Sequence, residues 1–112
     1  MNMGFFIGNL TRDPEQFETN NGKIGTNFDI AVNNNDAVLY IHCTAWGPLG
    51  VVCAEHLAKG KKVAVTGPVE IHAYLNRDNE PAATLNIPFL EKVEFLSPKE
   101  KEPEKKKTYY KR

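Results

Sequence analysis

The stretch VLYIHCTAW at residues 38–46 decides how this chain of 112 residues is interpreted. It alternates between a small apolar series and a polar and aromatic series. The apolar series is Leu39, Ile41, Cys43 and Ala45, and the opposite series is Val38, Tyr40, His42, Thr44 and Trp46. Because successive side chains of a β-strand point to opposite faces, this alternation predicts a strand with one face in a core. The other face, with two large aromatic rings, is unusual for a surface that meets only water.

The segments on both sides of this stretch also have the patterns of regular elements. GTNFDIAVN at 25–33 alternates, and MGFFIGNL at 3–10 is a short β-type run. GPLGVVCAEHLAKG at 47–60 is the one good helix candidate, with Gly60 as its stop and an inner side that we expect to hold Val51, Val52, Ala54, Leu57 and Ala58. Two longer β-type runs, 61–75 and 82–96, follow around the polar turn NRDNEP. The sequence therefore predicts an all-β fold, the five-stranded OB barrel with one helix between its third and fourth strands.

Composition changes at Ser97, where apolar periodicity stops and Lys, Glu and Pro dominate. We expect one domain at 1–96 and a flexible Lys/Glu-rich tail at 97–112 that cannot repay its ordering entropy. The formal net charge is +0, but the tail holds seven of the 14 basic residues and three of the 14 acidic ones. The tail thus carries +4 and residues 1–96 carry −4. A negative domain argues against nucleic acid if charge alone is considered.

Several classes of function lack their sequence signals. No apolar run approaches the roughly 18 residues of a membrane helix, and the opening MNMGFFIGNLTRD has no basic n-region, so we expect a cytoplasmic protein with no membrane partner. Cys43 and Cys53 form no CxxC pair and the histidines have no ligand spacing, so we expect buried free thiols and no metal site. We find no nucleophile elbow, phosphate-cradling glycine loop or paired carboxylates, and therefore expect no enzyme, no catalytic residue and no cofactor.

Essentially all of residues 1–96 resembles the bacterial and phage single-stranded DNA-binding proteins, and four segments carry this resemblance, in the same order and at similar spacing as the corresponding blocks of that family. They are Gly8-Asn9-Leu10 with Asp13-Pro14-Glu15, FDIAVN at 28–33, YIHCTAWG at 40–47, and HLAKGKKV at 56–63 leading to Val65-Thr66-Gly67. The resemblance implies an OB fold and sequence-independent binding and protection of single-stranded DNA in replication, recombination or repair. RNA is accommodated in principle, because no residue reads a 2′-hydroxyl unambiguously.

The resemblance assigns base stacking to Tyr40, Trp46 and Tyr74. Every base has a π-face, so a stacked base contributes about 1–3 kcal/mol whatever its identity. The alternative from the residues alone is that Trp46 is a core residue at a strand end and Tyr40 a strand former with an exposed hydroxyl. Phe17 fits either a core position or the aromatic face. The remaining phenylalanines lie in apolar runs and are expected in the core: Phe5, Phe6, Phe28, Phe89 and Phe95.

Long cations in loops or at strand ends are the candidates for phosphate contacts. They are Arg12, Lys23, Lys59, Lys61, Lys62 and Arg77, joined by His42 and His72 on the aromatic face. The tail offers charge and stacking of its own through Lys105, Lys106, Lys107, Tyr109 and Tyr110. A purely solubilising tail is the alternative.

The chain departs from the family pattern in ways that lower its charge. Positions that often hold Arg or Lys in relatives are His42, Pro48, Glu70, His72 and Ala73 here, and a tryptophan common after the second strand is missing from NNND at 33–36. We therefore expect binding to rest on stacking and to depend weakly on salt. The chain also ends in KKKTYYKR instead of the acidic tip with which bacterial relatives recruit replication and repair enzymes, which puts recruitment by that mode in doubt.

Family members commonly form homotetramers by pairing first strands and then joining the dimers, and the apolar opening MNMGFFIG suits such pairing or else lines the core. A dimer is the main alternative. Two other functions stay open. A primosome-type OB adaptor would suit the missing tryptophan, and an OB module that binds only protein would suit the −4 domain.

Overall fold

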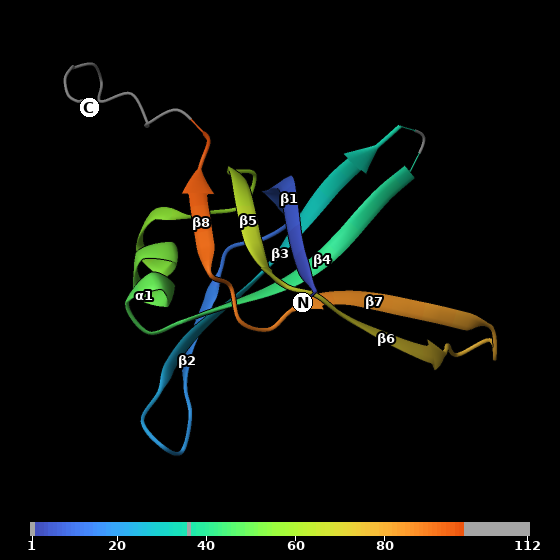
Figure 1. The fold of residues 1–112 in the computed structure, drawn as a ribbon, viewed down its shortest axis with the longest axis horizontal. Helices are drawn as coiled ribbons and strands as arrows, with labels where there is room; N and C mark the ends of the chain where they lie inside the picture. The colour runs from blue at the N-terminus through green and yellow to red at the C-terminus, as the bar shows by residue number, and fades with distance from the viewer. Residues whose placement is uncertain (1, 36, 98–112) are drawn as a thin grey trace.

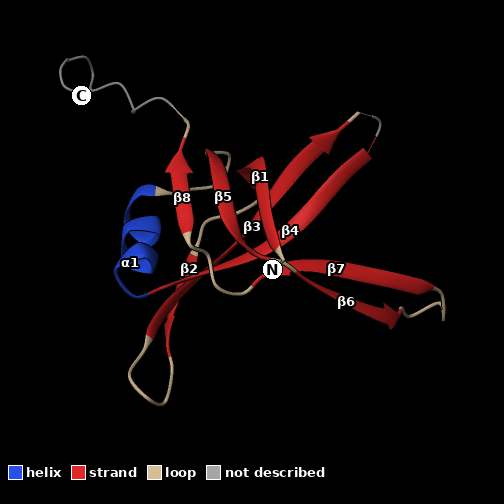
Figure 2. Cartoon of the chain, viewed as in Figure 1, coloured by secondary structure: helices blue, strands red, loops and turns tan. Residues whose placement is uncertain are grey.

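The computed structural model describes residues 2–35 and 37–97 of the chain. Within them lie eight strands and one helix (Figures 1 and 2). In chain order these are β1 (Met3–Leu10), β2 (Glu15–Glu18), β3 (Ile24–Asn34), β4 (Ala37–Trp46), α1 (Gly47–His56), β5 (Lys62–Pro68), β6 (Glu70–Leu75), β7 (Pro81–Ile87) and β8 (Lys92–Phe95). The predicted fold class, all-β with one helix after the strand at 38–46, is confirmed.

The strand count differs from the predicted five because both long runs break and because β2, a short strand that was not predicted, pairs with β3. The run 61–75 divides into β5 and β6 at Val69, whose N–H donates to the carbonyl of Asn2 at 3.0 Å. The run 82–96 divides into β7 and β8 at residues 88–91. The strands form one sheet in the order β6-β7-β4-β3-β1-β5-β8, with β2 on β3, so the ladder within the described residues is open and not a closed barrel.

The connection between β7 and β8 links the two sides of this opening. β7 pairs in parallel with β4, whereas β8 pairs antiparallel with β5. Between them, the Leu90 N–H donates to the Thr44 carbonyl at 3.0 Å and the Glu91 N–H donates to the Thr66 carbonyl at 2.8 Å. These two hydrogen bonds hold the crossing segment against both strands, so the pieces of the broken last strand still surround one core.

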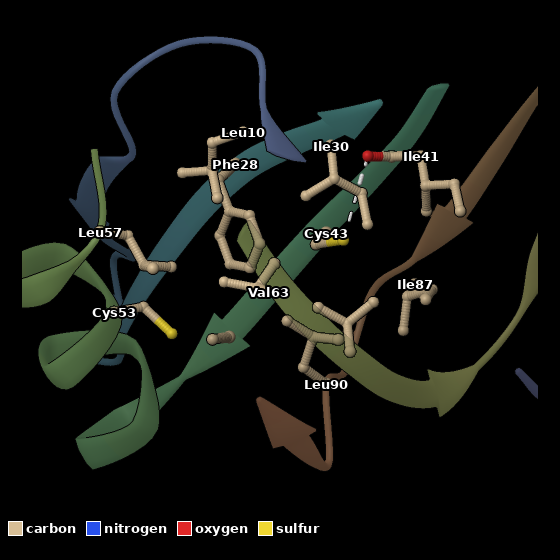
Figure 3. Packing of buried hydrophobic residues seen from close by; sticks show 12 residues of the cluster. Leu10, Phe28, Ile30, Ile41, Cys43, Cys53, Leu57, Val63, Ile87 and Leu90 are labelled. Carbon is tan, nitrogen blue, oxygen red and sulfur yellow. Dashed lines mark hydrogen bonds between the residues drawn. The ribbon is translucent and has the colours of Figure 1, made fainter. Parts of the chain in front are cut away.

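The core lies inside the curled sheet, under α1, and is built from alternate residues of the central strands (Figure 3). Its largest fully buried side chains include Phe28, Ile30, Ile41, Val63 and Ile87. The apolar face predicted for 38–46 is buried at its last three positions, Ile41, Cys43 and Ala45. Both cysteines are free and buried, as predicted.

Three phenylalanines expected in the core are exposed, which corrects the sequence interpretation. Pairing of β1 with β5 sets Phe6 against the core, so alternation turns its neighbour Phe5 outward. Phe89 lies in the connection after β7, where Leu90 takes the buried position instead. Phe95 lies on β8 at the end of the sheet order, next to the ring of His56 at 6.0 Å.

Helix α1 is shorter than the segment that predicted it. It ends at His56, and the N–H of Leu57 donates to the Cys53 carbonyl, so Gly60 belongs to the following turn with φ of 89°. The buried positions are Gly50, Cys53 and Leu57, spaced as one helical face, while Val52 is exposed. No helix of the described residues is long and apolar enough to cross a membrane.

Candidate nucleic-acid interface

One face of the sheet runs across β3, β4, β7 and β6. Paired positions place Asp29 beside His42, His42 beside Asn86, and Asn86 beside Glu70, so these side chains form one polar row. Alternation along β4 and β6 extends the face to further residues. They are Tyr40, Thr44 and Trp46 on β4, with His72 and Tyr74 on β6. The register thus brings together side chains that lie more than 30 residues apart in the sequence.

Tyr40 and Tyr74 present open rings on this face. Their exposed fractions are 58% and 50%. Each stands opposite an alanine on the neighbouring strand, Ala31 for Tyr40 and Ala82 for Tyr74. Because a methyl group covers little of an adjacent ring, both tyrosines keep a surface on which a planar ligand can stack.

Trp46 is half-buried in a small aromatic cluster. Its Nε1 donates a hydrogen bond to the Pro88 carbonyl at 2.8 Å. The ring of Phe17 meets the indole edge-on at 5.4 Å and 83°, and Phe89 stacks on it at 6.1 Å and 29°. Across from Trp46 lies Gly25, where an added Cβ would come within 2.5 Å of Phe17, so a glycine lets the rings pack. The position of Trp46 therefore agrees in part with both predictions. It lies on the predicted aromatic face, and its ring is packed by neighbouring side chains.

Phe89 is the exposed ring of this cluster, with an exposed fraction of 59%. Sequence reasoning placed it in the core because it lies in an apolar run. The overlooked signal is Pro88, which cannot donate a ladder hydrogen bond and so interrupts the strand just before Phe89.

An open groove of about 900 Å³ lies beside this cluster, between the β2–β3 turn and the start of α1. Its lining is mainly apolar, with one lysine. The lining residues are Thr19, Asn21, Gly22, Lys23, Ile24, Trp46, Gly47, Pro48, Val51 and Phe89. We call it the Trp46–Phe89 groove.

Carboxylates accompany three of the predicted phosphate contacts. Asp29 accepts from His42 Nδ1 at 2.7 Å through one oxygen and lies 3.5 Å from the guanidinium of Arg12 through the other. His72 Nε2 lies 3.3 Å from a carboxylate oxygen of Glu70. The sheet face therefore carries acidic as well as basic side chains. Arg12, His42 and His72 each already have a carboxylate partner with which a phosphate would have to compete.

The other predicted cations are dispersed. Lys23 lines the groove, Arg77 lies in the connection at the far end of the β6–β7 hairpin, and Lys59, Lys61 and Lys62 lie between α1 and the start of β5. Figure 1 shows these three connections at different ends of the molecule. The structure thus brings Arg12, His42 and His72 onto the aromatic face or beside it, places Lys23 at the groove beside Trp46, and leaves Lys59, Lys61, Lys62 and Arg77 apart.

The predicted tail contacts lie outside the described residues. They are Lys105, Lys106, Lys107, Tyr109 and Tyr110. Within the described part, sequence reasoning missed Asn86, whose Oδ1 is buried without a hydrogen-bond partner there. No set of three or more His, Cys, Asp or Glu side chains in that part gathers as a metal site would require.

An all-β fold with one helix between β4 and β5, whose sheet carries two exposed tyrosines beside a polar row, has the features of an OB-type domain. Comparison with known proteins makes this specific. The single-strand binding protein family matches this chain over residues 1–96, and the chain belongs to that family. The predicted resemblance is confirmed.

Two relatives, both single-stranded DNA-binding proteins, illustrate the similarity. The chain is 38% identical over 96 residues to the protein of Onion yellows phytoplasma (strain OY-M), which covers 83% of this chain and 91% of that protein. It is 32% identical over 100 residues to the protein of Clostridium perfringens (strain 13 / Type A), with coverage of 86% and 66%. A third, from Malacoplasma penetrans (strain HF-2), is 29% identical, and the matched region spans only 53% of its length.

Proposed function

We propose that this protein binds single-stranded DNA without regard to sequence and without catalysis, and protects it in the cytoplasm during replication, recombination or repair. One observation carries the proposal: two half-exposed tyrosines, Tyr40 and Tyr74, share a sheet face in a chain that belongs to the single-strand binding protein family. An aromatic ring accepts any base, because every base has a π-face.

In this mechanism, bases stack on Tyr40, Tyr74 and Trp46, and the DNA backbone crosses the polar row that lies between the two tyrosines and Trp46. Arg12, His42 and His72 contact phosphates only in competition with Asp29 and Glu70. The remaining predicted cations contact phosphates at the two ends of the proposed DNA path. Stacking therefore supplies most of the affinity, and salt weakens binding less than for a basic protein. The same face accepts single-stranded RNA, since stacking does not require a particular sugar.

Fluorescence of the single Trp46 tests the proposal. The protein is titrated at low salt with an oligothymidine, an oligouridine and a duplex of equal length. We expect quenching by the single strands and little change with the duplex, because bases stacked between neighbouring base pairs have no free π-face to offer. If no single strand binds at low salt, the proposal fails, and a protein-binding OB module or a primosome-type adaptor takes its place.

We also propose that the protein assembles into a homotetramer, in which chains pair through β1 and two such dimers then join. Strand β1 pairs with β5 along its length but with β3 only at Asn9 and Leu10, which leaves one edge of its first half without a partner among the described residues. The exposed side of that half is apolar, with Met3, Ile7 and a 59% exposed Phe5. Light scattering should give the mass of four chains, and Phe5→Glu should reduce it. A mass of two chains would favour the dimer, and a monomer would reject assembly.

We propose that the segment 97–112, which lies outside the described residues except for Ser97, adds DNA contacts to those of the domain at 1–96. Its charge of +4 offsets the −4 of the domain. Deleting residues 99–112 should weaken binding and reduce the salt slope by about 2, because the deleted residues include the three predicted phosphate contacts, Lys105, Lys106 and Lys107, at about 0.7 each. Unchanged affinity and slope would leave the tail a solubilising role only.

A further inference from the structure

The Trp46–Phe89 groove is apolar, open and bounded by an exposed aromatic ring. Trp46 is held in place by its hydrogen bond to Pro88, so its orientation does not depend on a ligand. Phe89 packs on the indole with one part of its ring and leaves 59% of its surface to solvent. Ile24 and Val51 add aliphatic surface to the lining. Exposed apolar area of this kind is costly in water and is typical of a binding site.

We propose that this groove binds one nucleobase of a single DNA strand, and that Phe89 is a base-contacting residue. The inference rests on the proposed function, and it adds to that function a site outside the predicted set of Tyr40, Trp46 and Tyr74. The groove continues the aromatic face, because Trp46 belongs to both. A strand whose bases stack on Tyr40 and follow β4 reaches the groove without changing direction.

Lys23 makes the Trp46–Phe89 groove suitable for a nucleotide and not for a purely apolar ligand. Its side chain is exposed and lines the groove, and none of the ion pairs in the described part of the chain engages it. A cation beside an apolar groove suits a base with its attached phosphate, since the base fills the groove and the phosphate meets the ammonium group.

The turn that carries Lys23 is held by its own hydrogen bonds. The Thr19 N–H donates to the Lys23 carbonyl at 2.8 Å, and the Lys23 N–H donates to Thr19 Oγ1 at 3.1 Å. Gly22 adopts φ of 84°, a left-handed conformation that glycine takes without strain, and its N–H donates to the Thr19 carbonyl at 2.9 Å. This side of the groove is therefore formed before DNA arrives, and binding does not have to order it.

Substitution of Phe89 tests the inference in the full-length protein. Phe89→Ala removes the ring, and Phe89→Leu keeps apolar packing on Trp46 but lacks a π-face. Anisotropy of a dye-labelled oligothymidine is the readout, because a substitution of Phe89, which stacks on Trp46, would by itself alter the tryptophan fluorescence. We expect both variants to lose about 5-fold or more in affinity, the effect of one stacked base. Phe95→Ala, at another exposed phenylalanine outside the groove lining, is the matched control and should bind as the wild type does.

Tyr40→Ala, measured in parallel, separates the two proposals. Weaker binding by Tyr40→Ala and both Phe89 variants, with Phe95→Ala unchanged, supports both. If Tyr40→Ala weakens binding and the Phe89 variants do not, the groove is not a base site, and a peptide partner becomes its candidate occupant. If the wild-type protein does not bind the oligonucleotide, the proposed function fails and the groove inference fails with it.

Discussion

The indole Nε1 of Trp46 donates a hydrogen bond to the carbonyl oxygen of Pro88 at 2.8 Å. These residues lie 42 positions apart, and the bond joins the end of β4 to the segment that crosses from β7 to β8. Because that segment replaces the continuous last strand of a closed barrel, the bond fastens the molecule where its ladder is interrupted. Trp46 thus has a structural role in addition to any contact with a base.

Trp46→Phe should lower the free energy of unfolding by about 1 kcal/mol. The substitution keeps a ring between Phe17 and Phe89 but removes the only donor that the side chain offers to Pro88. Urea denaturation followed by circular dichroism measures the change, since the variant has no tryptophan. Tyr40→Phe, a change of one exposed hydroxyl, is the control and should leave stability unaltered. Equal stability of the two variants would contradict a structural role for the bond.

The element order was predictable from the sequence because it depends on local alternation. VLYIHCTAW sets Ile41, Cys43 and Ala45 inward whatever its neighbours are, and β4 follows that pattern. The strand breaks were not predictable in this way. Val69 leaves the ladder because its N–H bonds to Asn2, a residue 67 positions away, and no local pattern reports such a partner.

The candidate site was likewise predictable where it depends on alternation along one strand, and not where it depends on contacts between strands. Tyr40 and Tyr74 lie on one face, as alternation and the family resemblance implied, whereas Phe89 was misplaced because an apolar run does not show which residue turns outward after a proline. The pairing of His42 with Asp29 also depends on the register between β3 and β4. A list of cations from the sequence therefore overstated the charge available for phosphates.

Tyr40→Ala and Tyr74→Ala should each weaken binding of an oligothymidine by about 1–3 kcal/mol. Both rings are half-exposed and opposite alanine, so stability should change little. Titration at constant salt measures affinity, and thermal unfolding checks the fold. Tyr40→Phe and Tyr74→Phe keep the rings and should restore normal affinity. Loss of binding in the phenylalanine variants would mean that the hydroxyls, not the rings, make the contact.

The two buried thiols should make the protein less stable at alkaline pH. Burial raises the pKa of Cys53 from 9.0 to about 11, and burial, together with the nearby Asp29 carboxylate, raises the pKa of Cys43 further. The thiols ionise in the unfolded chain at lower pH than in the folded one, so their contribution is complete below pH 9.0 and is lost as pH rises toward about 11.

Urea denaturation at these two pH values, for the wild type and Cys53→Ala, isolates this effect. The wild type should lose more stability between them than the variant does. Comparing the pH-dependent losses cancels the packing defect that alanine introduces. Equal losses would show that Cys53 ionises alike in both states. Cys53 should also react slowly with a thiol reagent until the chain is unfolded, because the thiolate is the reactive form.

Asp29→Asn should strengthen DNA binding and make it more sensitive to salt. The Asp29 carboxylate lies on the sheet face, where it engages both Arg12 and His42 and repels a phosphate. Asparagine removes the repulsion and frees Arg12, so affinity at low salt should rise about 2- to 5-fold and the salt slope should increase by about 0.7 for each phosphate newly contacted. Titrations over a series of salt concentrations measure both quantities.

Glu55→Gln makes the same change of charge on α1, away from this face, and should alter neither the affinity nor the salt slope. If Asp29→Asn binds more weakly than the wild type, then the Asp29 carboxylate holds His42 in position for the DNA, because an amide oxygen accepts the 2.7 Å hydrogen bond from His42 Nδ1 more weakly than a carboxylate does.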